Sequence, residues 1–287
     1  AKQMPAQGHT IDWLMQRDAD VLNEVSPIKW LGNTVYLTPG SGNKSLLGRI
    51  LNNLQGMWGD LMILPLALKT HYDVIQVRDK FFASLIGWIA AKLTGSHFVY
   101  WMSYPFAESK LYQADNRLVP HHQLVWLKGK IIQKLLYDII LPLADHIFVQ
   151  SERMKEDVAK YGIPYSKMTP VPMGIRSDQV GDGEKARAPH TDAPVLLYLG
   201  IILQLRKSQI LVQVLQQVRL RYPKATLIYV GEGQLPSDRQ AVEQEAVRLG
   251  LSDAVTITGF LPMEKAWEHV KQADICFSPF YPIPVLL

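Results

Sequence analysis

The last third of the chain, from Pro194 onward, repeats one unit: a short apolar run, a turn that carries glycine or a basic residue, and a helix with one apolar face. Short apolar runs that alternate with helices are typical of parallel sheets, whose strands are buried on both faces. This alternation therefore predicts an α/β domain with parallel strands at residues 195–199, 226–230, 255–257 and 275–277.

The first part of the chain shows the same alternation less regularly. Strands are predicted at residues 34–37, 74–77, 97–101, 146–149 and 169–173, and helices at residues 80–93, 125–143 and from Ser151 to Gly162. Ser151 has the chemistry of a helix N-cap, and Gly162 can take the left-handed position that ends a helix. In the last third, helices are predicted at residues 208–221 and in the segment that ends at Gly250.

A polar segment with several glycines and charges and no periodicity separates the two regions, which is typical of a linker. We therefore predict an N-terminal domain at residues 1–176, a linker at 177–193 and a C-terminal domain at 194–287.

Composition narrows the class of protein. A hydrophobic content of 48% with 20% charged residues is that of a folded chain. The single cysteine, Cys276, excludes an internal disulfide framework and a cysteine-rich metal site, which favours a reducing, cytoplasmic setting. A net charge of +4 is too small to indicate nucleic-acid binding, but it is compatible with anionic substrates or a membrane surface. No nucleic-acid partner is expected.

The apolar stretches do not predict a transmembrane helix. Residues 57–68 are too few to cross a bilayer, and residues 131–149 are interrupted by charges. In the predicted helix at 125–143, Lys128, Lys130 and Lys134 stand among large apolar residues, as in helices that lie on a membrane. A core helix with a solvated lysine edge is the simpler alternative.

The residues suited to binding or catalysis gather where predicted strands end. Gly200 ends the first strand of the C-terminal domain, and Arg206 and Lys207 stand just before a helix, whose N-terminus attracts anions. Gly231, Glu232 and Gly233 follow the next strand, and Gly259 with Phe260 follows the third. Ligands of open α/β sheets bind at this edge, so a phosphorylated ligand is predicted. Ordinary tight turns and solvated charges are the alternative interpretation.

Two other motifs are weaker. Residues 40–45 resemble a phosphate-binding loop, but Asn43 and Thr38 occupy the positions where that motif needs glycine. This loop either contacts an acceptor or is a simple turn. His121 and His122 have no acidic or cysteine partners at convincing ligand spacing, so no metal site is predicted.

The order of these motifs resembles the donor domain of glycosyltransferase family 4, the retaining GT-B enzymes also called group 1. The resemblance covers residues 194–280. Residues 150–163 and 171–175, the latter including Gly174, resemble the closing segment of the family's acceptor domain. The matching residues of the donor domain are Tyr198, Gly200, Arg206, Lys207, Gly231, Glu232, Gly233, Gly259, Phe260, Asp274 and Pro279.

The resemblance implies a GT-B fold, with two Rossmann-like domains and a cleft between them. It implies a nucleotide-sugar donor, no obligatory metal or other cofactor, and transfer with retained configuration. Arg206 and Lys207 match the basic positions that contact the donor diphosphate and act in catalysis. The glycine turns, Glu232, Phe260 and Pro279 match donor-binding positions.

The chain also departs from the family pattern. The family's histidine after the strand at 97–101 is absent, and Ser103, Tyr104 and Glu108 stand nearby as candidates for acceptor contact, together with Gly174. Simple exposure or helix capping is the alternative for these loop residues. The family's glutamate pair is expected beyond Leu287 and its first glycine-rich loop before Ala1, so residues 1–287 alone are expected to show little turnover.

The resulting hypothesis is a glycosyltransferase of saccharide biosynthesis. Its acceptor is a saccharide or a lipid-linked saccharide, and its setting is the cytoplasm, with peripheral contact at the inner face of a membrane. A GT-B nucleotide-sugar epimerase and a non-catalytic nucleotide-sugar-binding remnant remain the alternatives.

Overall fold

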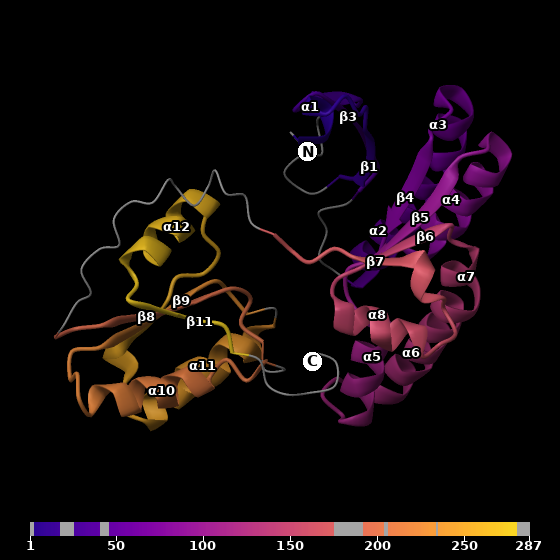
Figure 1. Ribbon diagram of the computed structural model, residues 1–287. Coiled ribbons are helices and arrows are strands. Elements are labelled where there is room, and N and C mark those ends of the chain that lie inside the picture. Colours follow the sequence, from indigo (N-terminus) through magenta and orange to yellow (C-terminus); the bar gives the residue numbers. More distant parts are fainter. Residues whose placement is uncertain are drawn as a thin grey trace. The chain divides into compact units, whose positions relative to one another are not determined.

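The computed structural model describes residues 3–17, 26–40, 46–174, 192–203, 206–233 and 235–279. It divides the chain into two compact units, unit 1 (Ala1–Gly174) and unit 2 (Ile175–Leu287) (Figure 1). Nearly all of the predicted linker, apart from Asp192 and Ala193, lies outside the described residues. So does the loop at 41–45.

Unit 2 is one parallel sheet with helices on both faces. Its strands are β8 (Val195–Leu199), β9 (Thr226–Val230), β10 (Val255–Ile257) and β11 (Ile275–Phe277), in the order β10-β9-β8-β11. Its helices are α10 (Ile210–Arg219), α11 (Pro236–Arg248), η5 (Ser252–Ala254) and α12 (Met263–Gln272). The predicted bounds of all four strands are confirmed.

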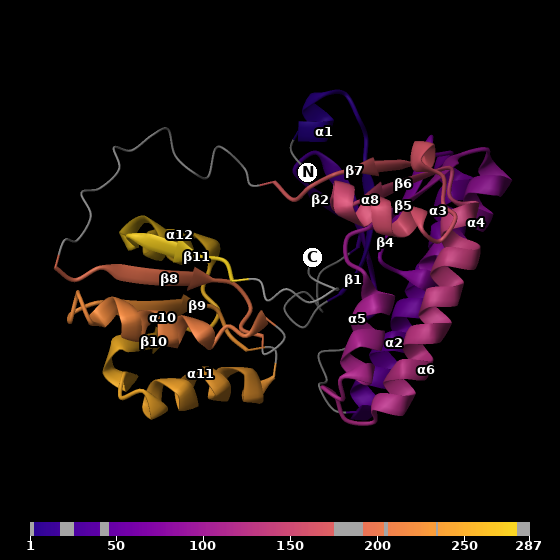
Figure 2. The same cartoon turned by 60° about the horizontal axis from the view of Figure 1, so that its bottom comes forward.

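The two faces of this sheet have separate cores. Leu196 and Leu227 pack with Leu215 of α10 and Val242 of α11, all fully buried. On the other face, Leu197 and Val230 pack with Ala266 of α12. Figures 1 and 2 show the same layering within the unit, with α10 and α11 on one side of the strands and α12 on the other. Helices therefore cover the faces of the sheet, and loops follow the carboxyl ends of its strands.

Unit 1 contains two sheets. The larger is parallel, in the order β4-β5-β6-β7, with β4 (Val74–Arg78), β5 (His97–Met102), β6 (His146–Val149) and β7 (Met168–Pro170). The smaller has the order β1-β3-β2, with β1 (Asp12–Gln16), β2 (Ile28–Trp30) and β3 (Asn33–Thr38). The helices are α1 (Gln3–Ala6), α2 (Leu46–Asp60), α3 (Ile63–Thr70), α4 (Phe81–Thr94), α5 (Phe106–Asp115), α6 (His122–Leu135), η2 (Leu136–Ile140), α7 (Leu141–Leu143), α8 (Glu152–Ala159) and η3 (Tyr165–Lys167).

The smaller sheet is not wholly parallel, because β2, a strand not predicted from the sequence, pairs antiparallel with β3. A two-residue turn, Leu31 (φ 51°) and Gly32 (φ 81°), joins these strands. Two positive φ values define the type I′ hairpin turn, for which Asn-Gly is the usual signal. Leucine is unusual at a positive φ, so neither β2 nor the hairpin was predicted.

Several predicted bounds shift by one to three residues, and three of the differences have an identifiable physical cause. The strand at 169–173 is shorter and ends at Pro170, because Pro170 and Pro172 have no N–H to extend the ladder. The helix at 125–143 is divided into α6, the wider π-helical turn η2 and α7, which contains Pro142. A proline ring clashes with the carbonyl group four residues earlier, and the wider turn relieves that clash.

The third difference is at the start of α10. The predicted helix at 208–221 begins at Ile210 instead, because the Ser208 carbonyl in its entry turn is bonded to the Tyr229 hydroxyl. Lys207, in the same turn, has a left-handed backbone (φ 49°).

Candidate functional site

The loops after β8 and β9 are joined by backbone hydrogen bonds at the carboxyl edge of the sheet in unit 2. The Gly200 N–H donates to the Val230 carbonyl over 3.0 Å, and the Ile202 N–H donates to the Glu232 carbonyl over 3.0 Å. Ile202 also forms a parallel bridge with Gly233. The ladder between the two strands therefore continues into the loops, which makes this edge a fixed backbone surface.

Gly231 lies where these loops meet. Its φ is 148°, and a Cβ atom on it would stand 2.0 Å from the Gly200 carbonyl oxygen. Only glycine fits so close to another backbone. An antiparallel bridge between Gly231 and Gly259 adds the loop after β10. The structure thus brings together three predicted donor residues, Gly200, Gly231 and Gly259, and Gly233 lies in the same stretch.

Glu232 supports this turn. Its Oε1 accepts a hydrogen bond from the Gly233 N–H (2.9 Å), and its Oε2 accepts one from Arg239 Nη1 (2.8 Å). The Gly233 N–H first, and then Arg239, lower the pKa of the Glu232 carboxyl group. Glu232 is therefore ionised at neutral pH. Arg239 of α11 was not singled out from the sequence, since nothing in a solvated helix marks one arginine as the partner of the loop before it.

Arg206 and Lys207 lie in the turn that leads into α10. A hydrogen bond joins this turn to β9: Ser208 is fully buried, and its carbonyl accepts a hydrogen bond from the Tyr229 hydroxyl (2.8 Å). The Arg206 N–H donates to the Leu203 carbonyl (3.1 Å), so Arg206 is held in a tight turn. Arg206 is half-buried and Lys207 is exposed. Both cations precede a helix N-terminus, an arrangement that favours an anion.

The remaining predicted donor residues lie at the same edge. Phe260 directly follows Gly259, and its side chain is 73% exposed, which leaves it open to contact a planar group. Pro279 comes two residues after β11, which pairs with β8 in the sheet. The ends of parallel strands share one edge, so Pro279 follows the strand beside the one that leads to Gly200.

In unit 1, Ser103 belongs to a polar cluster at the ends of β4 and β5. The Ser103 N–H donates to Asp79 Oδ1 (2.9 Å), and its hydroxyl donates to Asp79 Oδ2. Arg78 Nη2 donates to Ser103 Oγ (3.2 Å), and its guanidinium lies 4.7 Å from the ring centroid of Trp101.

Arg78 and Asp79 were missed in the sequence. The available signal was the charged run Arg78, Asp79 and Lys80 directly after a buried strand. Asp79 has a φ of 54°, and non-glycine residues with such a backbone gather at functional sites.

The other acceptor-side residues are not in this cluster. The Tyr104 hydroxyl donates to Ser109 Oγ (3.0 Å), and its ring packs edge to face on Phe106 at 5.0 Å. Gly174 is exposed and has open space around it.

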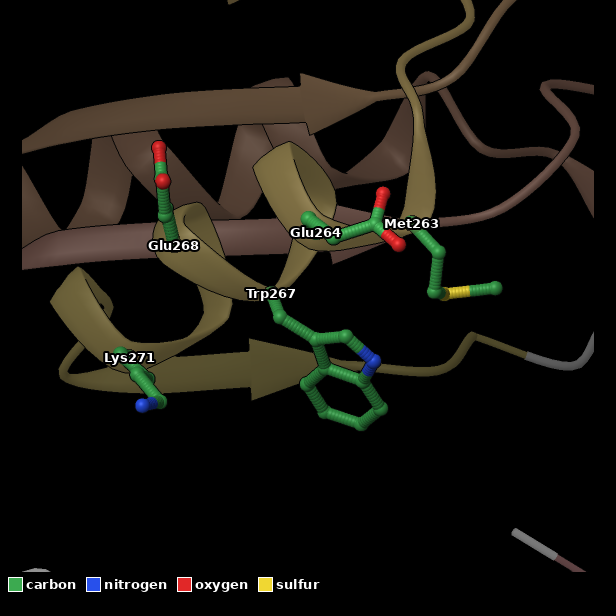
Figure 3. A pocket seen from close by; sticks show the side chains of 5 residues that line it. All are labelled: Met263, Glu264, Trp267, Glu268 and Lys271. Atoms are coloured by element: carbon green, nitrogen blue, oxygen red, sulfur yellow. The ribbon is translucent and has the colours of Figure 1, made fainter. Parts of the chain in front are cut away.

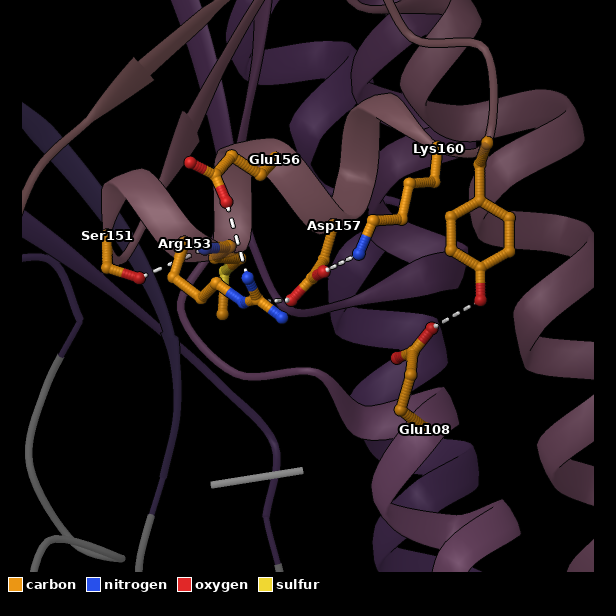
Figure 4. A network of polar contacts seen from close by, with 8 residues as sticks. Glu108, Ser151, Arg153, Glu156, Asp157 and Lys160 are labelled. Carbon is orange, nitrogen blue, oxygen red and sulfur yellow. Dashed lines mark hydrogen bonds and ion pairs between the residues drawn. The ribbon is translucent and has the colours of Figure 1, made fainter. Parts of the chain in front are cut away.

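Glu108 of α5 instead bonds to Tyr137 of η2 and to Tyr161, which follows α8. Figure 4 shows Glu108 with one of these hydrogen bonds. Its Oε1 accepts from the hydroxyl groups of Tyr137 (2.7 Å) and Tyr161 (3.4 Å), whose rings stack 3.7 Å apart. Burial raises the pKa of Tyr137, and the negative charge of Glu108 raises it further, so the tyrosine remains a donor. These contacts give Glu108 a role in packing helices and separate it from Ser103.

Two shallow hollows are lined by residues other than the predicted donor residues. One of about 390 Å³ runs along the exposed side of α12, where Trp267 points away from the helix (Figure 3). It is lined by Met263, Glu264, Trp267, Glu268 and Lys271. The other, of about 350 Å³, is lined by Lys130, Gln133, Lys134, Tyr137, Asp138 and Tyr161.

Among the described residues, no three or more His, Cys, Asp or Glu side chains are grouped so that they could hold a metal ion. In the same part of the chain, no helix has the length and apolar character needed to cross a membrane.

Comparison with known proteins identifies both parts of the chain. Residues 1–179 match the model of Glycosyltransferase Family 4, and residues 193–286 match that of Glycosyl transferases group 1. Sequence comparison finds no match among curated proteins.

Several solved structures are similar in fold. Sucrose-phosphate synthase from Thermosynechococcus elongatus has a TM-score of 0.66 and 18% identity, over 98% of this chain and 69% of that one. An Escherichia coli structure, described as trehalose-6-phosphate bound with UDP-2-fluoro glucose, has a TM-score of 0.60 and 10% identity, over 96% and 73%. The Anabaena HepE complex with UDP has a TM-score of 0.54 and 17% identity, over 84% of this chain and 59% of HepE. The chain thus spans about three fifths of HepE, and these likenesses show a GT-B fold of two Rossmann-like domains.

Proposed function

The chain belongs to glycosyltransferase family 4, and from this membership we propose that it transfers a sugar from a nucleotide-sugar donor to a saccharide or lipid-linked acceptor, with retention of configuration. The observation that carries the proposal is the joined backbone of Gly200, Gly231 and Gly259, beside the turn that holds Arg206 before α10. Glycine backbone at the carboxyl edge of the sheet, with two cations before a helix N-terminus, suits a nucleotide diphosphate.

In the proposed reaction, the bond between the anomeric carbon and the diphosphate oxygen breaks, and the acceptor hydroxyl oxygen forms the new bond to that carbon. The hydroxyl proton passes to the departing diphosphate. Negative charge grows on the departing diphosphate. Arg206 and Lys207 stabilise this charge more strongly in the transition state than in the bound donor, so they accelerate the step. We propose that these side chains and the N-terminus of α10 replace a metal ion in this role.

The donor nucleotide we propose is uridine diphosphate. HepE and the E. coli structure are described with UDP or a UDP sugar, and both are similar in fold to this chain. Phe260, open to solvent beside Gly259, offers its ring or neighbouring backbone to the base.

For the acceptor, we propose that Ser103 and the cluster of Arg78 and Asp79 contact its hydroxyl groups. Arginine, carboxylate and hydroxyl groups at strand ends offer both donors and acceptors, as polyols require. A lipid-linked acceptor would bring the protein to the inner face of a membrane.

The test is the affinity for UDP. We expect Arg206→Ala to weaken UDP binding, measured by titration calorimetry, by about tenfold or more, since a charge-assisted hydrogen bond contributes roughly 1.5–3 kcal/mol. Arg219→Ala, which removes an arginine at the other end of α10, is the matched control and should bind UDP as the wild type does. Equal affinities of Arg206→Ala and the wild type would show that the donor-site assignment is wrong.

A further inference from the structure

Helix α6 exposes a second apolar face, opposite the one it buries. Gly129 and Ile132 are buried, and a Cβ atom on Gly129 would stand 3.0 Å from the Leu111 side chain of α5, so this face packs closely. On the outer face, the side chains of Leu124, Leu127 and Ile131 are 67%, 52% and 59% exposed. Their spacing of three and four residues aligns them in one stripe.

Lysines border this stripe. Lys128 lies four residues after Leu124, and Lys134 lies three residues after Ile131, which puts them on opposite sides of the stripe. Both are exposed, as is Lys130. Lys130 Nζ lies 5.7 Å from the ring centroid of Trp126, itself 43% exposed. The outer face of α6 therefore has an apolar centre and a cationic border that includes an aromatic ring.

The same region holds two cations close together across α5 and α6. The pKa of Lys110 is lowered first by burial and then by the positive charge of Lys128. Like charges at this range repel each other, so the arrangement costs free energy in the isolated protein. An anionic partner would offset that cost.

From this geometry we propose that α6 binds the surface of a membrane that contains anionic lipids. Leu124, Leu127 and Ile131 enter the boundary between head groups and acyl chains, while Lys128, Lys130 and Lys134 contact the lipid phosphates. This inference rests on the proposed function only for its purpose, access to a lipid-linked acceptor. The binding itself needs neither donor nor acceptor.

The lysines are what favour a lipid surface over an apolar partner. Long lysine side chains can bury their stems while the ammonium groups reach the head groups, and Trp126 has the ring type that prefers this boundary. Helix α2 provides the contrast. Its residues Leu51, Leu54 and Trp58 are 57%, 52% and 73% exposed, but its sequence contains one basic residue, Arg49. Nothing at α2 indicates what covers it, so the inference is limited to α6.

The experiment is vesicle cosedimentation of the full chain. We expect binding to vesicles of phosphatidylcholine mixed with phosphatidylglycerol, weak binding to phosphatidylcholine alone, and release by added salt. The variant Lys128→Glu/Lys130→Glu/Lys134→Glu should lose at least roughly tenfold in binding, because each lysine near an anionic surface contributes on the order of fivefold. Leu124→Ser/Leu127→Ser/Ile131→Ser should lose a similar factor by losing apolar burial.

The matched control is Lys92→Glu/Leu93→Ser at the end of α4, where Leu93 is 62% exposed beside a lysine. It makes the same kind of change outside α6 and should bind vesicles as the wild type does. Far-ultraviolet circular dichroism verifies that each variant is folded, and single substitutions replace any triple variant that is not.

Three results would overturn the inference: equal binding to neutral and anionic vesicles, unchanged binding of the folded α6 variants, or a light-scattering mass that falls from dimer to monomer when the stripe is changed, which would mean that a second copy covers it. UDP affinity is measured on the same variants. Unchanged UDP affinity with lost vesicle binding, or the reverse, separates failure of this inference from failure of the proposed function.

Discussion

At the scale of single residues, the carboxyl edge of the sheet in unit 2 depends on glycines, which have no Cβ atom. Because Gly231 has no Cβ, its backbone can lie against the Gly200 carbonyl and pair with Gly259 at a distance that any other residue would block. Gly233 is under a similar demand, since a Cβ on it would stand 2.7 Å from the Leu235 carbonyl oxygen. Both positions thus need glycine for close backbone packing.

The prediction at this scale is that Gly231→Ala disrupts the edge. The backbone strain costs about 1–3 kcal/mol, and the clash with the Gly200 carbonyl adds to it, so the free energy of unfolding should fall by about 3 kcal/mol or more in urea denaturation. Gly250→Ala is the control in the same unit. Gly250 also has a positive φ (68°), but its Cβ would meet nothing within 4 Å, so a loss of about 1 kcal/mol is expected. Equal losses for the two variants would show that the close contact at Gly231 is unimportant.

At the scale of elements, some helix ends follow from the capping residues at those positions and can be predicted from the sequence. The Ser151 side chain accepts a hydrogen bond from the Met154 N–H (3.1 Å), as predicted for the N-cap of α8 (Figure 4). Gly162 has the left-handed φ of 85° that was expected of it. Where an end depends on distant residues, local rules fail, and α10 begins two residues late because its entry turn is bonded to Tyr229.

We predict that Ser151→Ala lowers the free energy of unfolding by about 1 kcal/mol, because one N–H group at the start of α8 loses its acceptor. Chemical denaturation followed by circular dichroism measures the change. Ser151→Asp should retain most of the stability, since its carboxylate can accept the same bond and also interacts favourably with the helix dipole. A Ser151→Asp variant as unstable as Ser151→Ala would contradict the cap interpretation.

At the scale of the whole molecule, each unit has its own core. The main core of unit 1 is built from residues between Ala67 and Met168, and the cores of unit 2 from residues between Leu196 and Phe277. Trp267 is the single tryptophan of unit 2, and all the others precede Gly174. Tryptophan fluorescence therefore reports mainly on unit 1, whereas calorimetry reports on both.

We predict that UDP raises the unfolding temperature of unit 2 and leaves that of unit 1 unchanged. With free UDP at 100 times its dissociation constant, a folded-state ligand adds about 2.7 kcal/mol to the stability of the unit that binds it. Differential scanning calorimetry should then show a shifted transition that the fluorescence melt does not follow. A UDP-induced shift in the fluorescence melt equal to the calorimetric one would mean that the units unfold together or that unit 1 binds the nucleotide.

The sequence by itself determined the strands of unit 2, the cap at Ser151 and the presence of glycines and bases at strand ends, because these follow from hydrophobic periodicity and local backbone chemistry. It missed the hairpin through Leu31, whose positive φ is enforced by strand pairing and contradicts the residue's own preference. It also grouped Glu108 with Ser103, although Glu108 bonds to Tyr137 of η2 and to Tyr161 in the turn after α8. Only the tertiary structure decided which loops touch and which polar groups pair, such as Asp79 with Ser103, because those contacts join residues whose nearness is set by the order of the strands in the sheet.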